Sequence, residues 1–285
     1  MKWKRARRSE NVEDRRGMGA RGVGGLGIGG IAVVVVISLL LGRNPMELLG
    51  LVSQIESNLP TQSRPAPAPG EDPEYEFIAS ILGETEDVWT ALFAARGARY
   101  EAPRLVLFSD YVSSACGGAS AAVGPFYCPG DRQVYLDLSF FREMETRLGG
   151  GGEFAEAYVI AHEVGHHLQT LTGVSQQVQD QRRSGRNLAG ADGLLVRQEL
   201  QADCYAGVWA HHAQLRHDWL EPGDIEAALN TASAIGDDRL QRQSQGTVVP
   251  DAFTHGTSAQ RVHWFRAGFD TGDPGECDTF AAERL

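Results

Sequence analysis

The sequence predicts a mainly helical α+β fold with a small sheet, behind an N-terminal transmembrane helix. Three observations support this prediction. Residues 22–41 carry no charged side chain, and about 20 apolar residues are enough for an α-helix to cross a bilayer. Several later segments repeat apolar residues with the spacing of a helix. Only two short runs, at residues 105–108 and 133–138, have the apolar or alternating pattern of strands.

The N-terminal region is basic, whereas the rest of the chain is acidic. Residues 1–42 have a net charge of +5 and residues 43–285 a net charge of −16. Lysine and arginine ahead of a membrane span favour a cytoplasmic N-terminus. We therefore expect a cytoplasmic tail at residues 1–21, a single-pass anchor at 22–42 and an exported domain in the cell envelope. A cleavable signal peptide is the alternative, but no clear A-x-A site follows Leu41.

Small residues in the predicted span suggest self-association. Gly25 and Gly29 would lie on one helix face, where small side chains let transmembrane helices approach closely. After the span, residues 43–73 are expected to form a juxtamembrane helix and a proline-rich extended linker. The acidic remainder argues against nucleic-acid binding, which needs a basic surface.

Residues 74–285 form the predicted globular domain, and the hydrophobic content of the whole chain, 42%, is high enough for a buried core. Its first strand should be residues 105–108 and its second residues 133–138. Residues 236–250 should be loosely ordered, and residues 182–192 should form a loop that borders the site. The expected helices cover residues 74–96, 139–148, 153–171, 194–215 and 222–235. A further helix should begin at residue 174 and precede the loop at 182–192, and residues 254–265 should form a loop that opens a last helix.

Four cysteines fit an exported domain. Cys116 and Cys128 flank a short loop, and Cys204 and Cys277 are the natural remaining pair. Four cysteines allow three connectivities, so this pairing is a hypothesis. A thiolate metal site is the alternative, but no two cysteines have the C-x-x-C spacing.

The helix predicted at residues 153–171 carries the motif H-E-x-x-H, with His162, Glu163 and His166. Residues four apart lie on one helix face, so both imidazoles can bind one Zn²⁺. Glu163 would act as general base on a zinc-bound water. The competing interpretation is a helix with surface histidines. A third ligand would decide between the two, because catalytic zinc has three protein ligands.

The following helix supplies a third ligand. Glu199 and Asp203 also stand four residues apart on one face. Glu199 would complete the site for one Zn²⁺ per chain, and Asp203 would accept a hydrogen bond from a ligand histidine. The alternative for both carboxylates is a solvated helix face.

H-E-x-x-H followed by E-x-x-x-D resembles the gluzincin metallopeptidases. Three stretches, SACGGASAAVGPFYCPGDRQVYLDLSFF, AHEVGHHLQTLTGV and RQELQADCYAGVWAH, are similar to the bacterial family of putative neutral zinc metallopeptidases. The resemblance covers residues 75–280 and implies a zincin-like domain and a protein or peptide substrate. It also implies that the strand at 133–138 pairs with substrate as an edge strand, and the alternative for this segment is a core strand. His255, braced by Arg261, would stabilise the oxyanion as a catalytic residue. The alternative for His255 is a surface loop histidine.

The function predicted from the sequence is that of a membrane-anchored zinc endopeptidase. A catalytically silent, zinc-stabilised binding or scaffold protein of the cell envelope is the alternative. A retained Glu163 argues against it, because a structural zinc site has no use for a base. A membrane adaptor without metal is a third interpretation, and it predicts no bound zinc.

Overall fold

The computed structural model describes residues 1–16, 67–68, 70–120, 124–147 and 151–285. The predicted span at 22–42 and the juxtamembrane helix lie outside these residues. Within them, no helix is both long and apolar enough to cross a membrane. The predicted α+β class, mainly helical with small sheets, is confirmed.

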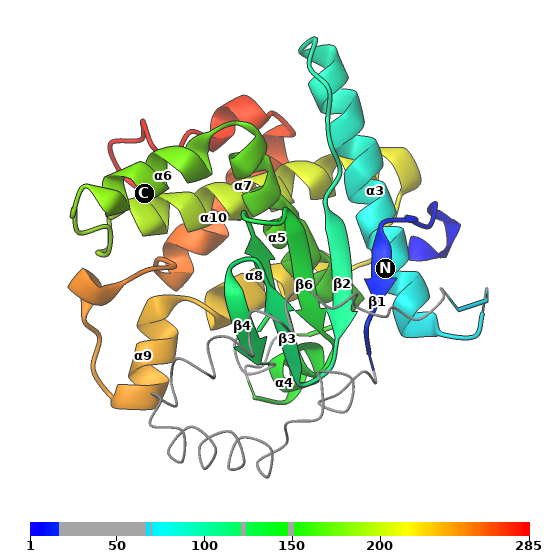
Figure 1. Ribbon diagram of the computed structural model, residues 1–285, viewed down its shortest axis with the longest axis horizontal. Coiled ribbons are helices and arrows are strands. Elements are labelled where there is room, and N and C mark those ends of the chain that lie inside the picture. Colours follow the sequence, from blue (N-terminus) through cyan, green and yellow to red (C-terminus); the bar gives the residue numbers. More distant parts are fainter. Residues whose placement is uncertain (17–66, 69, 121–123, 148–150) are drawn as a thin grey trace, which may run out of the picture.

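A four-stranded sheet lies against the helices (Figure 1). Its strands are β1 (Val12–Asp14), β2 (Arg104–Phe108), β6 (Gln133–Asp137) and β5 (Phe126–Cys128), in that order across the sheet. The first three are parallel, and β5 runs antiparallel to β6. A separate hairpin joins β3 (Tyr111–Ser114) and β4 (Gly117–Ser120).

Both predicted strands form, but the expected role of one of them is wrong. β6 lies between β2 and β5, so its two edges are already paired and it cannot add a substrate strand. The edge strands of this sheet are β1 and β5, and β5 consists of three residues that the alternating pattern did not reveal.

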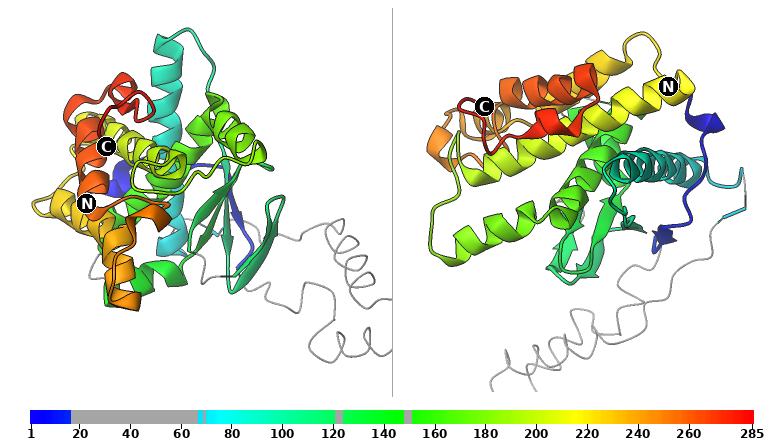
Figure 2. Two further views of the ribbon diagram at one scale, coloured as in Figure 1. Left: turned by 90° about the vertical axis from the view of Figure 1, so that its left-hand side faces the viewer. Right: turned by 90° about the horizontal axis from the view of Figure 1, so that it is seen from above.

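Four long helices carry most of the core. They are α3 (Pro73–Ala95), α5 (Glu153–Leu171), α7 (Leu194–His217) and α10 (Ser258–Thr271). In the views of Figure 2, α7 packs against α5 on the side that points away from the sheet, and α10 packs along α7. Glycines allow the helices to approach closely. A Cβ at Gly165 would lie 2.9 Å from the Cα of Ala202, and one at Gly207 would lie 2.1 Å from the carbonyl oxygen of Phe265.

Shorter elements connect these helices. They are η1 (Trp3–Arg5), α4 (Ser139–Arg147), α6 (Val174–Arg183), α8 (Asp224–Ala234), α9 (Asp237–Gln245), η3 (Pro250–Ala252) and η4 (Pro274–Cys277). The expectation of a loosely ordered segment at 236–250 is wrong in its first half, where α9 forms. The sequence of α9 is so polar that it has no apolar face from which a helix could be predicted.

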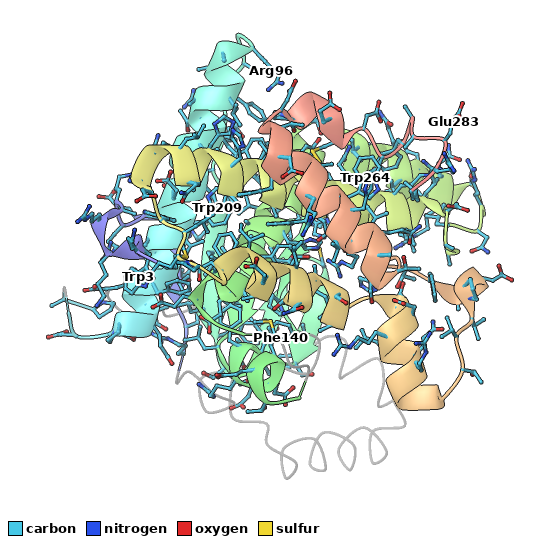
Figure 3. The ribbon with its side chains drawn as sticks, turned by 180° about the vertical axis from the view of Figure 1, so that it is seen from behind. Trp3, Arg96, Phe140, Trp209, Trp264 and Glu283 are labelled. Atoms are coloured by element: carbon cyan, nitrogen blue, oxygen red, sulfur yellow. A yellow bond between two sulfur atoms is a disulfide. The ribbon has the colours of Figure 1, made fainter. Side chains whose placement is uncertain are left out.

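The N-terminal residues belong to the folded domain. The sequence predicts a separate tail at residues 1–21 and a domain that begins at residue 74. In the structure, β1 joins the sheet beside β2, and Trp3 lies beside α3 (Figures 1 and 3). The folded unit therefore consists of residues 1–16 together with the residues described from 67 onward.

Two disulfides are present, Cys116–Cys128 and Cys204–Cys277. This confirms the predicted pairing. The second bond ties η4, near the C-terminus, to the middle of α7.

Candidate metal centre

Three predicted ligands converge at the centre of the molecule. His162 and His166 are one turn apart on α5, and their ring centroids are 4.8 Å apart. Glu199 reaches them from α7. Its Oε2 lies 3.2 Å from Nε2 of His162, and its Oε1 lies 3.5 Å from Nε2 of His166. One donor atom from each residue can be chosen so that all lie within 4.8 Å of one another.

This donor set fits zinc. Two ligands bound to one Zn²⁺ at about 2.0–2.1 Å in tetrahedral geometry lie roughly 3.3 Å apart. The measured separations of 3.2 and 3.5 Å match that value. Two imidazoles and one carboxylate are also the ligand set of a catalytic zinc, which leaves one position for substrate or solvent. His162, His166 and Glu199 would hold the ion.

Asp203 lies directly behind His162. Its Oδ1 accepts a hydrogen bond from Nδ1 of His162 at 2.8 Å, which leaves Nε2 facing the ligand cluster. Two further donors reach the same carboxylate. Tyr158 donates its hydroxyl to Oδ1 at 2.5 Å, and Arg261 donates Nε to Oδ2 at 2.8 Å and Nη2 to Oδ1 at 2.9 Å. Asp203 is fully buried, and Arg261 is 2% exposed.

These contacts set the charges of the buried groups. Burial raises the pKa of Asp203, but the charges of Arg261 and His162 outweigh it and lower the pKa to about 2. Burial lowers the pKa of His162, but the charge and hydrogen bond of Asp203 raise it to about 10. Burial raises the pKa of Glu199, but the charge of His166 and hydrogen bonds from both histidines lower it more. The pKa of Glu199 therefore lies well below its usual range. The cluster therefore holds anionic carboxylates that a cation can pair with.

His166 is oriented by a chain of amides. Its Nδ1 lies 3.0 Å from Oε1 of Gln169. The Gln169 amide nitrogen donates to the carbonyl oxygen of Gln198 at 2.7 Å and to Oε1 of Gln201 at 3.1 Å. Gln201 in turn donates to the carbonyl oxygen of Cys277 at 3.0 Å. No sequence motif pointed to Gln169, although its position three residues after His166 places it on the same helix face.

A cleft of about 560 Å³ opens over the cluster. Glu163 lines it together with both histidines and Glu199. Arg182, at the end of α6, also lines it, so the segment expected to border the site does reach it at that residue. Several side chains give the cleft apolar walls: Pro125, Phe126, Phe140, Val159, Leu195 and Ile235.

His255 lines the same cleft, from the loop before α10. Its side chain is 51% exposed, and its Nδ1 lies 3.3 Å from Oδ1 of Asp237. Asp237 also holds the loop, because its Oδ2 accepts the backbone N–H groups of Thr254, His255 and Gly256 at 2.7, 2.6 and 3.0 Å. The hydrogen bond to Asp237 raises the pKa of His255.

The expected brace between Arg261 and His255 is wrong, because Arg261 is engaged with Asp203 and Tyr158. No local pattern could reveal this pairing, because α10 follows α7 only after 40 residues. His167 points away from the ligands, as its neighbouring position on the helix predicts. Its ring nitrogens lie 3.1 Å from the Tyr127 hydroxyl and 2.6 Å from the carbonyl oxygen of Glu101.

Comparison with known families gives the same assignment as the geometry. A family model described as putative neutral zinc metallopeptidase matches residues 1–280. The chain belongs to this family. The match confirms the family that the sequence motifs resemble. The region matched by the model of the zinc metallopeptidase family includes residues 1–16, which agrees with their place in the fold.

Relatives of similar length occur in distant bacteria. Protein YpfJ of Escherichia coli strain K12 is 47% identical over 286 residues, which cover 98% of this chain and 99% of that protein. Protein Mb2605 of Mycobacterium bovis is 45% identical over 218 residues, which cover 73% of this chain and 71% of that protein. No solved structure matches the chain.

Proposed function

We propose that this member of the zinc metallopeptidase family is a zinc-dependent endopeptidase with one zinc ion per chain. One observation carries the proposal. Two imidazoles and a carboxylate converge at zinc-binding separations, and Glu163 lines the same cleft as these three residues. A zinc site that serves only stability has four protein ligands and no adjacent base.

The reaction is hydrolysis of a peptide bond. Zinc, when bound, polarises the substrate carbonyl and lowers the pKa of the attacking water. Glu163 accepts a proton from that water as its oxygen bonds to the carbonyl carbon. Glu163 then donates the proton to the amine nitrogen as the C–N bond breaks. His255, whose pKa is raised by Asp237, would donate a hydrogen bond to the developing oxyanion.

The cleft suits an extended peptide. β5 forms one wall through Phe126 and Tyr127. Within the described chain it pairs with β6 along one edge, which leaves its other edge for the backbone of a substrate. Such pairing needs no particular side chain, while the apolar walls would favour apolar residues beside the cleaved bond.

We propose further that the peptidase domain lies outside the cytoplasm. The two disulfides support this location, because such bonds persist in oxidising compartments.

Substitution of Glu163 by glutamine tests the proposed function. Full-length Glu163→Gln should retain about one zinc per chain and the stability of the parent, while its cleavage of unfolded casein falls by at least ~100-fold. The matched control is Glu226→Gln, an exposed glutamate on α8. The parent and the control should lose activity on chelation and regain it with zinc. Undiminished cleavage by Glu163→Gln would remove Glu163 from the mechanism, and a parent that cleaves nothing would favour the scaffold function.

A further inference from the structure

Residues 1–16 are held by backbone pairing. β1 lies parallel to β2 in the register Val12–Leu105, Glu13–Val106 and Asp14–Leu107. The N–H of Leu105 donates to the carbonyl oxygen of Asn11 at 2.9 Å, and the N–H of Arg15 donates to that of Leu107 at 2.7 Å. Residues Leu105 to Phe108 of β2 are buried. Without β1, the backbone groups along one edge of β2 would lose their hydrogen-bond partners.

Side chains anchor the same segment to α3 and α5. Trp3 is only 6% exposed and packs edge-to-face on Phe77, with 5.4 Å between the ring centroids. Its indole N–H donates to Oε1 of Glu153, the first residue of the helix that carries the zinc motif, at 2.8 Å. Gly83 provides the space, because a Cβ there would lie 2.7 Å from the carbonyl oxygen of Arg7.

Carboxylates of the domain pair with four basic side chains of the segment. Arg7 pairs with Glu86 at 2.6 Å and with Asp87 at 2.9 Å. Three more pairs link segment and domain: Lys2 with Asp218, Arg8 with Glu76, and Arg16 with Asp72. Carboxylate partners within the fold are therefore present for four of the residues whose charge favours a cytoplasmic N-terminus: Lys2, Arg7, Arg8 and Arg16.

These contacts cannot form across a bilayer. We infer that residues 1–16 and the peptidase domain lie on the same side of any membrane that the chain meets. A chain that crosses once between residues 16 and 67 would place them on opposite sides and remove β1 from the sheet. This inference replaces the single-pass arrangement expected from the sequence. It does not depend on the proposed function, and it makes the N-terminal segment a structural support for the zinc helix.

Two cysteine pairs in the full-length protein test the inference. Glu13 and Arg104 form an ion pair at 3.4 Å, and Arg7 and Asp87 form one at 2.9 Å. We would prepare Glu13→Cys/Arg104→Cys and Arg7→Cys/Asp87→Cys, each with a site for a specific protease inserted at residues 61–66. Intact cells would be treated with a short membrane-permeant bis-maleimide, and the purified protein would then be cleaved at that site.

The expected result is that each pair stays one covalent chain after cleavage, whereas the four single-cysteine controls separate into two fragments. Because the reagent enters both compartments, the result does not depend on which side holds the domain. Separation of both double variants into fragments, in protein that retains zinc and both native disulfides, would overturn the inference. Cross-linking of either pair in intact cells supports it, because the bis-maleimide is too short to join thiols across a membrane.

Discussion

The carboxylate of Asp203 accepts a hydrogen bond from Nδ1 of His162 at 2.8 Å, and Nε of Arg261 donates to the same carboxylate at 2.8 Å. One buried anion therefore connects the candidate metal ligand His162 on α5, its own helix α7 and the helix α10. It fixes the tautomer of His162, because only the form with a proton on Nδ1 can donate this bond. The orientation of His162 and the contacts between the three helices therefore share one side chain.

Replacement of Asp203 by asparagine should weaken zinc binding by ~10–100-fold, the usual effect of removing the hydrogen-bond partner of a ligand histidine. The variant also leaves the Arg261 guanidinium buried without its counter-ion, so the free energy of unfolding should fall by about 3–5 kcal/mol. Competition with a chelator measures the first effect and urea unfolding the second. Tyr158→Phe, which removes one neutral donor, should change both far less. Equal losses in the two variants would contradict the central role of the carboxylate.

Gln169 should affect zinc binding because it orients His166. Gln169→Met keeps the volume but removes the acceptor for Nδ1, and it leaves the Gln198 carbonyl without its donor. We expect zinc affinity to fall by ~10-fold and the unfolding free energy by about 1–3 kcal/mol. Gln176→Met, an exposed position on α6, is the matched control and should change neither. Unchanged zinc affinity in Gln169→Met would show that His166 needs no such partner.

The structure should not tolerate even a methyl side chain at Gly165. In an ordinary helix, alanine in place of glycine stabilises by about 1 kcal/mol. Here the added Cβ would lie 2.9 Å from the Cα of Ala202 and 3.0 Å from its carbonyl oxygen. Gly165→Ala should therefore push α7 away from α5, lower the unfolding free energy by about 1–3 kcal/mol and reduce zinc affinity by moving Glu199. Thermal unfolding with and without zinc measures both, and a variant more stable than the parent would refute the close contact.

Local patterns predicted which side chains would lie close together. H-E-x-x-H and E-x-x-x-D each place two groups on one helix face. Contact between these two helices is therefore enough to bring His162, His166, Glu199 and Asp203 together. Arg261 could not be assigned in this way, because its partner depends on how α10 crosses α7. The place of β1 was hidden too, since a three-residue strand has no period to recognise and its basic neighbours resemble a cytoplasmic flank.

The first turn of α5 makes a pH-dependent contribution to stability. Burial, together with the charges of Glu153, Glu74 and Glu145, raises the pKa of Glu156 from 4.5 to about 7. The folded chain thus binds this proton more tightly than the unfolded chain. The resulting stabilisation is fully present below pH 4.5 and is lost as the pH rises through about 7.

The glutamine of Glu156→Gln cannot ionise, so this variant should not lose stability as the pH rises through about 7. At pH 8 its free energy of unfolding should exceed that of the parent by on the order of 1–2 kcal/mol, after the favourable interaction of a carboxylate with the helix N-terminus is subtracted. At pH 4.5 the two proteins should be nearly equal. Urea unfolding of the zinc-loaded protein at both pH values measures the difference. Glu226→Gln, exposed in the first turn of α8, should show no such gain. A gain for Glu156→Gln that is the same at both pH values would point to packing rather than charge as its cause.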